Sequence, residues 1–254
     1  MEYFVKQNSV VRKIWGKSDT VLFIFAGAAA EFALNKAVDW LYFTGKLPSD
    51  PLGRLFSTVS YARKIVFSST EEANQAIDIM RQIHSTVEQN RGTSIPDWAY
   101  RDVLFMLIHY SIASYELLEK RLSNDEKEEI YNVFYRVGIR MGLTGLPSNY
   151  LEWLLVRENH LNEDLKRSKY TADLFKQYKK HLGNIRFKML IESQKLLVPN
   201  RVKRLLHFND FYWLKPMISV YKMSRLIKMD KSIKNLLLPY DYKTQINELD
   251  IRVG

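Results

Sequence analysis

The sequence predicts an all-α protein, a single-domain bundle of many helices around one core. Three observations favour this class. Apolar residues recur at spacings of three and four over long stretches, which is the period of an amphipathic helix. Two Ser-x-x-Glu capping boxes, at Ser69 and Ser123, mark helix starts. Only 10 Gly and 7 Pro occur in 254 residues, which favours helices with short connections over a sandwich or barrel.

Composition excludes several kinds of chemistry. The chain has no cysteine, which excludes disulfides, thiolate-bound metals, iron–sulfur clusters and a cysteine nucleophile. The net charge of +10 comes from residues 161–254, where 20 Lys and Arg stand against 9 Asp and Glu. One interpretation of such a basic region with interleaved aromatic residues is that it binds nucleic acid or an anionic membrane surface. The alternative is a basic face that only contacts solvent. Because no nucleic-acid motif is present, we expect no nucleic-acid partner.

No stretch of the sequence is apolar for long enough to span a membrane. The longest apolar run covers residues 21–30 and ends at Glu31, whereas a span needs about 20 residues. A signal peptide also fits poorly, because Glu2 and Asp19 lie in the segment before this run. We expect a cytoplasmic protein, with attachment to a membrane surface as the alternative.

Residues 1–20 predict an amphipathic N-terminal helix or arm, and residues 20–34 an apolar helix of small residues. Asp50 and Pro51 then form an N-cap and a first helical position. In the helix that follows, Arg54, Thr58 and Tyr61 lie on one face. This face suits an anionic group lying along the helix. The alternative is an arginine directed to solvent and a threonine bonded to its own helix.

The stretch SSTEEANQAIDIMRQIHSTVEQ predicts the helix that carries the main candidate site residue, His84. Ser69 begins it, and its apolar stripe contains Ala73, Ala76, Ile77, Met80, Ile83, His84 and Val87. A histidine facing a core needs a partner for its ring nitrogens, since a buried unpaired polar group costs about 1–3 kcal/mol. The pattern alone leaves two interpretations open: a core histidine bonded to a neighbour, or a ligand of a metal or haem.

The stretch VLFMLIHYSIASY is apolar nearly all round and predicts a buried central helix. His109 and Ser111 are its polar exceptions, and both can border one cavity although they do not share a face. His160 ends a later helix, and we interpret it as structural. Further helices are expected over residues 148–161, 170–183, 187–197, 201–208 and 212–229, followed by an apolar plug at 236–239 and a mobile tail over 240–254.

In this order the motifs resemble the family of haem-dependent oxygenases that includes the latex-clearing rubber oxygenases and the ER-bound oxygenase of mycophenolic acid biosynthesis. The motifs are FAGAAAEFAL, DPLGRLFSTVSYARKIVF, AIDIMRQIHSTV, and WAYRDVLFMLIHYSIASY through YRVGIRMGLTGLPSNYLEWL. The similarity covers roughly residues 21–150. Their order and spacing carry the resemblance more than any single motif does.

The resemblance implies an all-α fold enclosing a haem pocket, with His84 as the axial ligand of the iron of haem b. It places Arg54 and Thr58 at the haem, with Tyr61 on the same helix face, and His109 and Ser111 at the border of the pocket. Rubber-cleaving members have a lysine just before the motif threonine. Here that position is Ser57, so the resemblance implies no lysine as the second axial ligand.

We therefore expect one domain over residues 1–254 and a haem b oxygenase that acts with dioxygen on an apolar, olefinic or isoprenoid small molecule. The residues at the reaction would be Arg54, Thr58, His109 and Ser111, while His84, Arg54, Thr58 and Tyr61 would bind the cofactor. The alternative is a haem- or lipid-binding protein without enzymatic activity, which docks on a membrane surface through its basic C-terminal region.

Overall fold

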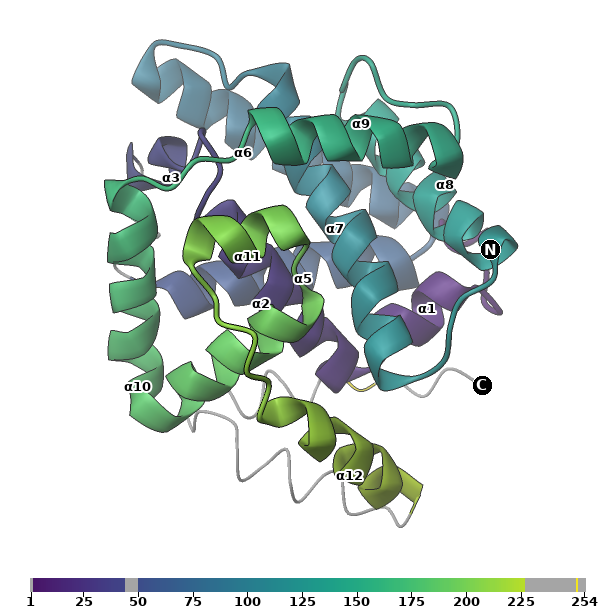
Figure 1. Cartoon of the computed structure of the whole chain (residues 1–254). Coiled ribbons are helices and arrows are strands. Elements are labelled where there is room, and N and C mark those ends of the chain that lie inside the picture. The colour runs from purple at the N-terminus through teal and green to yellow at the C-terminus, as the bar shows by residue number, and fades with distance from the viewer. Residues whose placement is uncertain (1, 44–49, 227–249, 251–254) are drawn as a thin grey trace.

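The computed structural model describes residues 2–43, 50–226 and 250, without the side chains of residues 41, 51, 52, 54–56 and 224–226. The expected plug at 236–239 lies outside the described residues, as does the expected tail at 240–254 apart from Asp250. Within the described part the chain is helical, with isolated bridges and no strand (Figure 1). The helices are α1 (Val10–Trp15), α2 (Ser18–Phe32), α3 (Asp39–Phe43), α5 (Pro51–Phe67), α6 (Thr70–Arg91), α7 (Asp97–Leu118), α8 (Asn124–Arg140), α9 (Tyr150–Glu163), α10 (Lys169–Leu197), α11 (Asn200–Leu206) and α12 (Leu214–Leu226).

The predicted capping signals begin their helices. Ser69 and Ser123 each form a complete capping box at the starts of α6 and α8. The Asp50 side chain accepts a hydrogen bond from the Gly53 backbone N–H at the start of α5, with Pro51 in the first turn. Helix α9 begins slightly later than expected, because Asn149 rather than Ser148 accepts the bond from the Glu152 backbone N–H. All-α architecture is therefore confirmed for the described residues.

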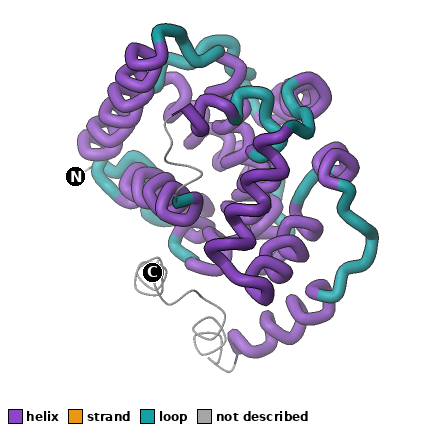
Figure 2. The backbone as a smooth tube through the Cα atoms, turned by 90° about the vertical axis from the view of Figure 1, so that its left-hand side faces the viewer, coloured by secondary structure: helices purple, strands orange, loops and turns teal. Residues whose placement is uncertain are grey.

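Helices α2 and α7 form the centre of the molecule and pack directly against each other. Small residues allow this close approach: a Cβ atom added to Gly27 would lie 2.2 Å from the Tyr110 ring. Helices α1 and α8 pack on one side of this pair, and α10 packs against α2, α5 and α7. Figure 2 shows the same bundle turned by 90°. One continuous apolar core therefore connects helices from both halves of the sequence.

Residues 2–20 contribute to this core. Phe4, Val11, Ile14 and Trp15 are each at most 5% exposed, and the Trp15 indole donates a hydrogen bond to the Ser111 hydroxyl at 3.2 Å. The segment expected as a helix or arm is therefore packed between α2, α5 and α8.

Two C-terminal helices that the sequence separates are joined by a bend. Residues 169–197 are two helices that meet at a kink at Gly183, where φ is 71°, and they share the label α10. This backbone conformation is readily adopted only by glycine. Beyond α11, α12 packs Leu214 and Ile218 against Leu118 of α7.

Candidate functional site

His84 lies in the second half of α6, on the side that faces the core. The first half of that side is fully buried at Ala73, Ala76 and Ile77, and Met80 is partly buried. His84 itself is half-buried, and its Nδ1 atom is shielded from solvent. Its ring meets the Tyr100 ring of α7 edge to face, with centroids 5.2 Å apart. The predicted apolar stripe is therefore present, but it becomes more open toward His84.

Polar contacts fix this end of α6 to its neighbours. The Glu88 carboxylate accepts hydrogen bonds from the Ile95 backbone N–H at 2.7 Å and from the Tyr100 hydroxyl at 3.2 Å. One turn further, Arg91 pairs with Asp39 at 2.7 Å and lies 4.0 Å from the centroid of the Trp40 ring. The segment around His84 is thus held to α3 and to the start of α7.

Helix α5 carries the predicted Arg54, Thr58 and Tyr61. Thr58 and Tyr61 are half-buried and Ser57 is exposed, whereas the side chain of Arg54 lies outside the described residues. Helices α5 and α6 pack together and are joined by a short turn. Arg54 on α5 and His84 on α6 therefore lie at about the same distance along their helices from this turn.

The two polar residues of α7 point to different parts of the molecule. Ser111 is fully buried and accepts the hydrogen bond from Trp15 described above. His109 is half-buried and lies edge-on to Tyr110 at 4.9 Å. Its Nε2 atom is shielded from solvent and has no hydrogen-bond partner among the described residues. A backbone hydrogen bond with Leu197 also acts on the His109 ring.

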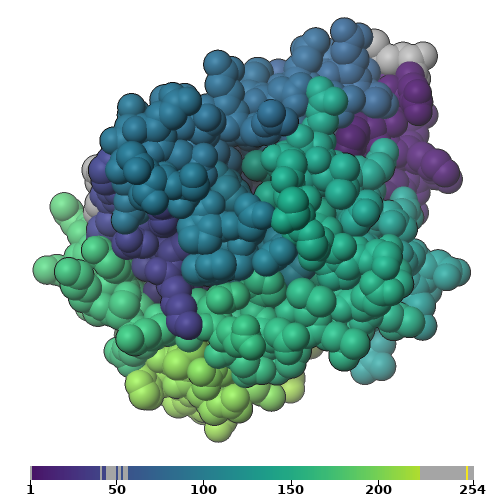
Figure 3. Space-filling view, turned by 90° about the horizontal axis from the view of Figure 1, so that it is seen from above, coloured from purple at the N-terminus to yellow at the C-terminus, as the bar shows by residue number. Residues whose placement is uncertain are grey.

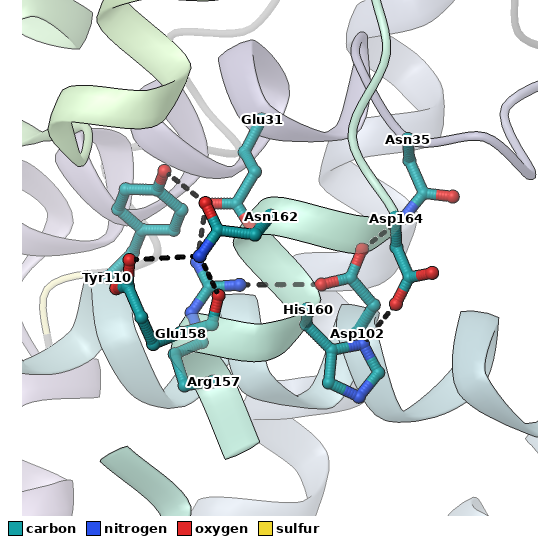
Figure 4. Close-up of polar contacts among 9 residues, drawn as sticks. All are labelled: Glu31, Asn35, Asp102, Tyr110, Arg157, Glu158, His160, Asn162 and Asp164. Carbon is teal, nitrogen blue, oxygen red and sulfur yellow. Dashed lines mark hydrogen bonds and ion pairs between the residues drawn. The ribbon is translucent and has the colours of Figure 1, made fainter. Parts of the chain in front are cut away.

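A buried charge network lies beside His109, and Figure 4 shows it in close-up. Arg157 of α9 is 3% exposed, and Glu31 of α2 and Asp102 of α7 are fully buried. The Arg157 guanidinium pairs with Glu31 at 2.5 Å and with Asp102 at 3.4 Å. The Tyr110 hydroxyl donates to Glu31 at 2.8 Å, and the Asn35 amide donates to Asp102. Three helices are therefore tied together through one arginine.

Burial and mutual charge shift the pKa values of this network. Burial and the nearby Glu31 raise the pKa of Asp102 to about 8, against the opposing effect of Arg157. Burial alone would lower the pKa of Arg157, but Glu31 and Asp102 prevail and raise it. Burial lowers the pKa of His109 to about 4, and Arg157 adds to this shift. His109 is therefore a neutral imidazole at neutral pH.

His160 occupies a structural position. It is 6% exposed, and its Nδ1 lies 2.7 Å from the Asp164 carboxylate (Figure 4). Its ring packs edge-on against Phe105. Burial lowers its pKa despite Asp164.

A groove of about 840 Å³ opens between α6 and α8. Figure 3 shows the molecule from above, with a hollow between its blue and green atoms. The lining of the groove is largely polar and includes the exposed Arg140–Asp78 ion pair at 2.5 Å. None of the predicted site residues lines it. Among the described residues, no cluster of three His, Asp or Glu side chains is arranged to hold a metal ion.

Within residues 2–43 and 50–226, no helix combines the length and hydropathy that crossing a bilayer requires.

The fold and site thus define an all-α protein with a histidine on a half-open helix face and a second, neutral histidine beside a buried ion network. The family described as ER-bound oxygenase mpaB/B'/Rubber oxygenase, catalytic domain, matches residues 13–217. The chain belongs to this family, as its motifs predicted, and is therefore an oxygenase. Searches of curated proteins and of solved structures give no match.

The Glu31–Arg157–Asp102 network was not predicted from the sequence. One signal was present: Glu31 interrupts a run of small apolar residues inside a helix. A charged residue in such a place is rarely buried unless it is paired. Arg157 gave no comparable signal, because VRENHL is polar enough to pass for a solvated face.

Proposed function

We propose that this oxygenase depends on haem b and acts with dioxygen on an apolar, olefinic or isoprenoid small molecule. The observation that carries the proposal is the place of His84 in a chain of this oxygenase family: an imidazole on the core-facing side of α6, open enough to admit a ligand. Family membership also favours an enzyme over a binding protein without activity.

The residues around His84 fit a large flat apolar group. Ile83, next to His84 on α6, remains 41% exposed, and Val103, one turn after Tyr100 on α7, is 38% exposed. Covering such side chains is favourable by about 25 cal/mol per Å² of apolar surface. A porphyrin lying against His84 would cover apolar surface here, and the imidazole is a usual non-thiolate ligand of haem iron.

Each remaining side chain would have its own part. When bound, haem iron supplies the activation of dioxygen. Arg54 would pair with a carboxylate such as a propionate, and the Thr58 hydroxyl would donate a hydrogen bond within the pocket, with Tyr61 beside it. The neutral His109 would accept a proton or hydrogen bond at its buried Nε2 atom. Ser111, which already bonds Trp15, would support the helix that presents His109.

The first test is the haem content of the purified protein. We expect a Soret absorption band and about one iron per chain, and we expect His84→Ala to lose both. His181→Ala is the matched control, because His181 is an exposed histidine of α10. If His84→Ala kept full haem with an unchanged spectrum, the assignment of the ligand would be wrong.

The second test concerns the substrate. Oxygen consumption is measured with squalene, an apolar isoprenoid, and with its saturated analogue squalane. We expect consumption with squalene alone, because only the olefin offers a double bond to oxidise. Equal rates with both compounds would contradict the olefinic substrate class without touching the ligation by His84.

A further inference from the structure

The last described helix, α12, has two apolar sides. Its inner side packs Leu214 and Ile218, which are 6% and 8% exposed, against the end of α7. Its outer side carries Met217, Val220 and Met223, which recur every three residues and therefore share one face. We call these three side chains the α12 face; they are 51%, 66% and 69% exposed, and Phe211, which precedes the helix, is 70% exposed.

Single exposed apolar residues are common on protein surfaces, but three large ones on one helix face mark an interaction site. Packing of α12 on the core does not require these outer residues to be apolar, since its inner side already holds the helix against α7. Among the described helices α12 lies lowest in Figure 1, away from α9 at the top. Helix α6, which carries His84, also lies near the top, so the α12 face is apart from His84.

The helix itself carries charges of one sign, and the exposed Asp210 precedes it. Residues 211–226 contain three basic residues and no acidic one. Lys215 is exposed at the side of α12, and Lys222 of the same helix is half-buried. An apolar helix face with a basic border is typical of helices that lie in the interface of a bilayer. Each Lys or Arg near an anionic surface adds attraction that salt screens.

We propose that the α12 face docks this protein on the surface of a bilayer that contains anionic lipids. Phe211, Met217, Val220 and Met223 would enter the boundary between headgroups and acyl chains, while Lys215 and its basic neighbours would contact lipid phosphates. A second copy of the chain fits less well, because it would bring one basic border against another. The proposal stands independently of haem, although a bilayer is also where an apolar substrate would be dissolved.

The test is cosedimentation of the full chain with vesicles of phosphatidylcholine, with or without phosphatidylserine. We expect the double variant Met217→Glu/Val220→Glu to bind the anionic vesicles at least about tenfold more weakly than the unmodified protein, because charges then replace the apolar stripe. The matched control is Leu151→Glu/Leu155→Glu on α9, where the leucines are 69% and 72% exposed. This control should bind as the unmodified protein does.

The basic border is tested separately. Lys215→Glu should weaken binding to the phosphatidylserine vesicles, with little change on phosphatidylcholine alone, and added salt should weaken the unmodified protein in the same way. Equal binding by the α12 double variant and the α9 control would overturn the proposal.

Two further outcomes would also overturn it. One is a dimer in sedimentation velocity that the α12 variant dissociates, because the face would then be an interface between copies. The other is a melting temperature that falls much further in the α12 variant than in the control, because the face would then be covered within the free protein.

Discussion

Arg157 pairs with two carboxyl groups that the core keeps from water. Removing it leaves Glu31 and Asp102 buried and facing each other without a cation, which is far more costly than losing an exposed ion pair. We expect Arg157→Met to lower the free energy of unfolding by about 3 kcal/mol or more, measured by urea denaturation. Arg204→Met, at an exposed arginine of α11, should change it by less than about 0.5 kcal/mol. Similar values for the two variants would contradict the ion network.

Asp102 should make stability fall as the pH rises. Its pKa is raised to about 8 in the folded protein, so between its unfolded pKa and pH 8 the folded state holds a proton that the unfolded state has lost. The free energy of unfolding therefore decreases with pH in this window. The lowered pKa values of His109 and His160 act in the opposite direction, but only below their unfolded value near pH 6.5.

The window from pH 6.5 to 8 consequently isolates Asp102. Over this interval we expect the unmodified protein to lose about 1.5 kcal/mol of unfolding free energy relative to Asp102→Asn, which cannot titrate. Urea denaturation at several pH values measures the difference. Parallel pH profiles for the two proteins would show that Asp102 is ionised throughout.

At the scale of the helices, helix propensity and tertiary packing predict opposite effects of Gly27→Ala on stability. Helix propensity favours Ala over Gly by about 1 kcal/mol, so Gly27→Ala should stabilise an isolated α2. In the folded protein the added Cβ would lie 2.2 Å from the Tyr110 ring, which is itself fully buried and cannot move away. We expect Gly27→Ala to lower the melting temperature, with a loss of about 1–3 kcal/mol. An unchanged or higher melting temperature would mean that α2 and α7 are less tightly packed than described.

The helices themselves were predictable because their signals are local. The capping boxes at Ser69 and Ser123 involve residues three apart, and the bend at Gly183 needs only the glycine itself. The stripe that contains His84 was likewise visible from spacing alone. The packing of residues 2–20 into the core was not, because an amphipathic segment looks the same whether its apolar side meets a core or stays an arm.

At the scale of the whole molecule, we predict a single unfolding transition. The principal core contains residues from Phe4 to Val202, so neither half of the chain retains a core when the other unfolds. Differential scanning calorimetry should give one peak whose calorimetric and van't Hoff enthalpies agree. Two separable peaks would contradict the prediction of one domain over the chain.

The sequence by itself determined the helical class, most helix starts and the family, because periodicity, caps and ordered motifs are properties of neighbouring residues. Only the tertiary structure decided which residues become partners. Arg157 is 126 residues from Glu31 and 55 from Asp102, and no local pattern pairs them. The burial of Asp102 and His109, which sets their pKa values, likewise depends on how the helices pack. So does the exposure of the α12 face. Neither property is encoded in any single helix.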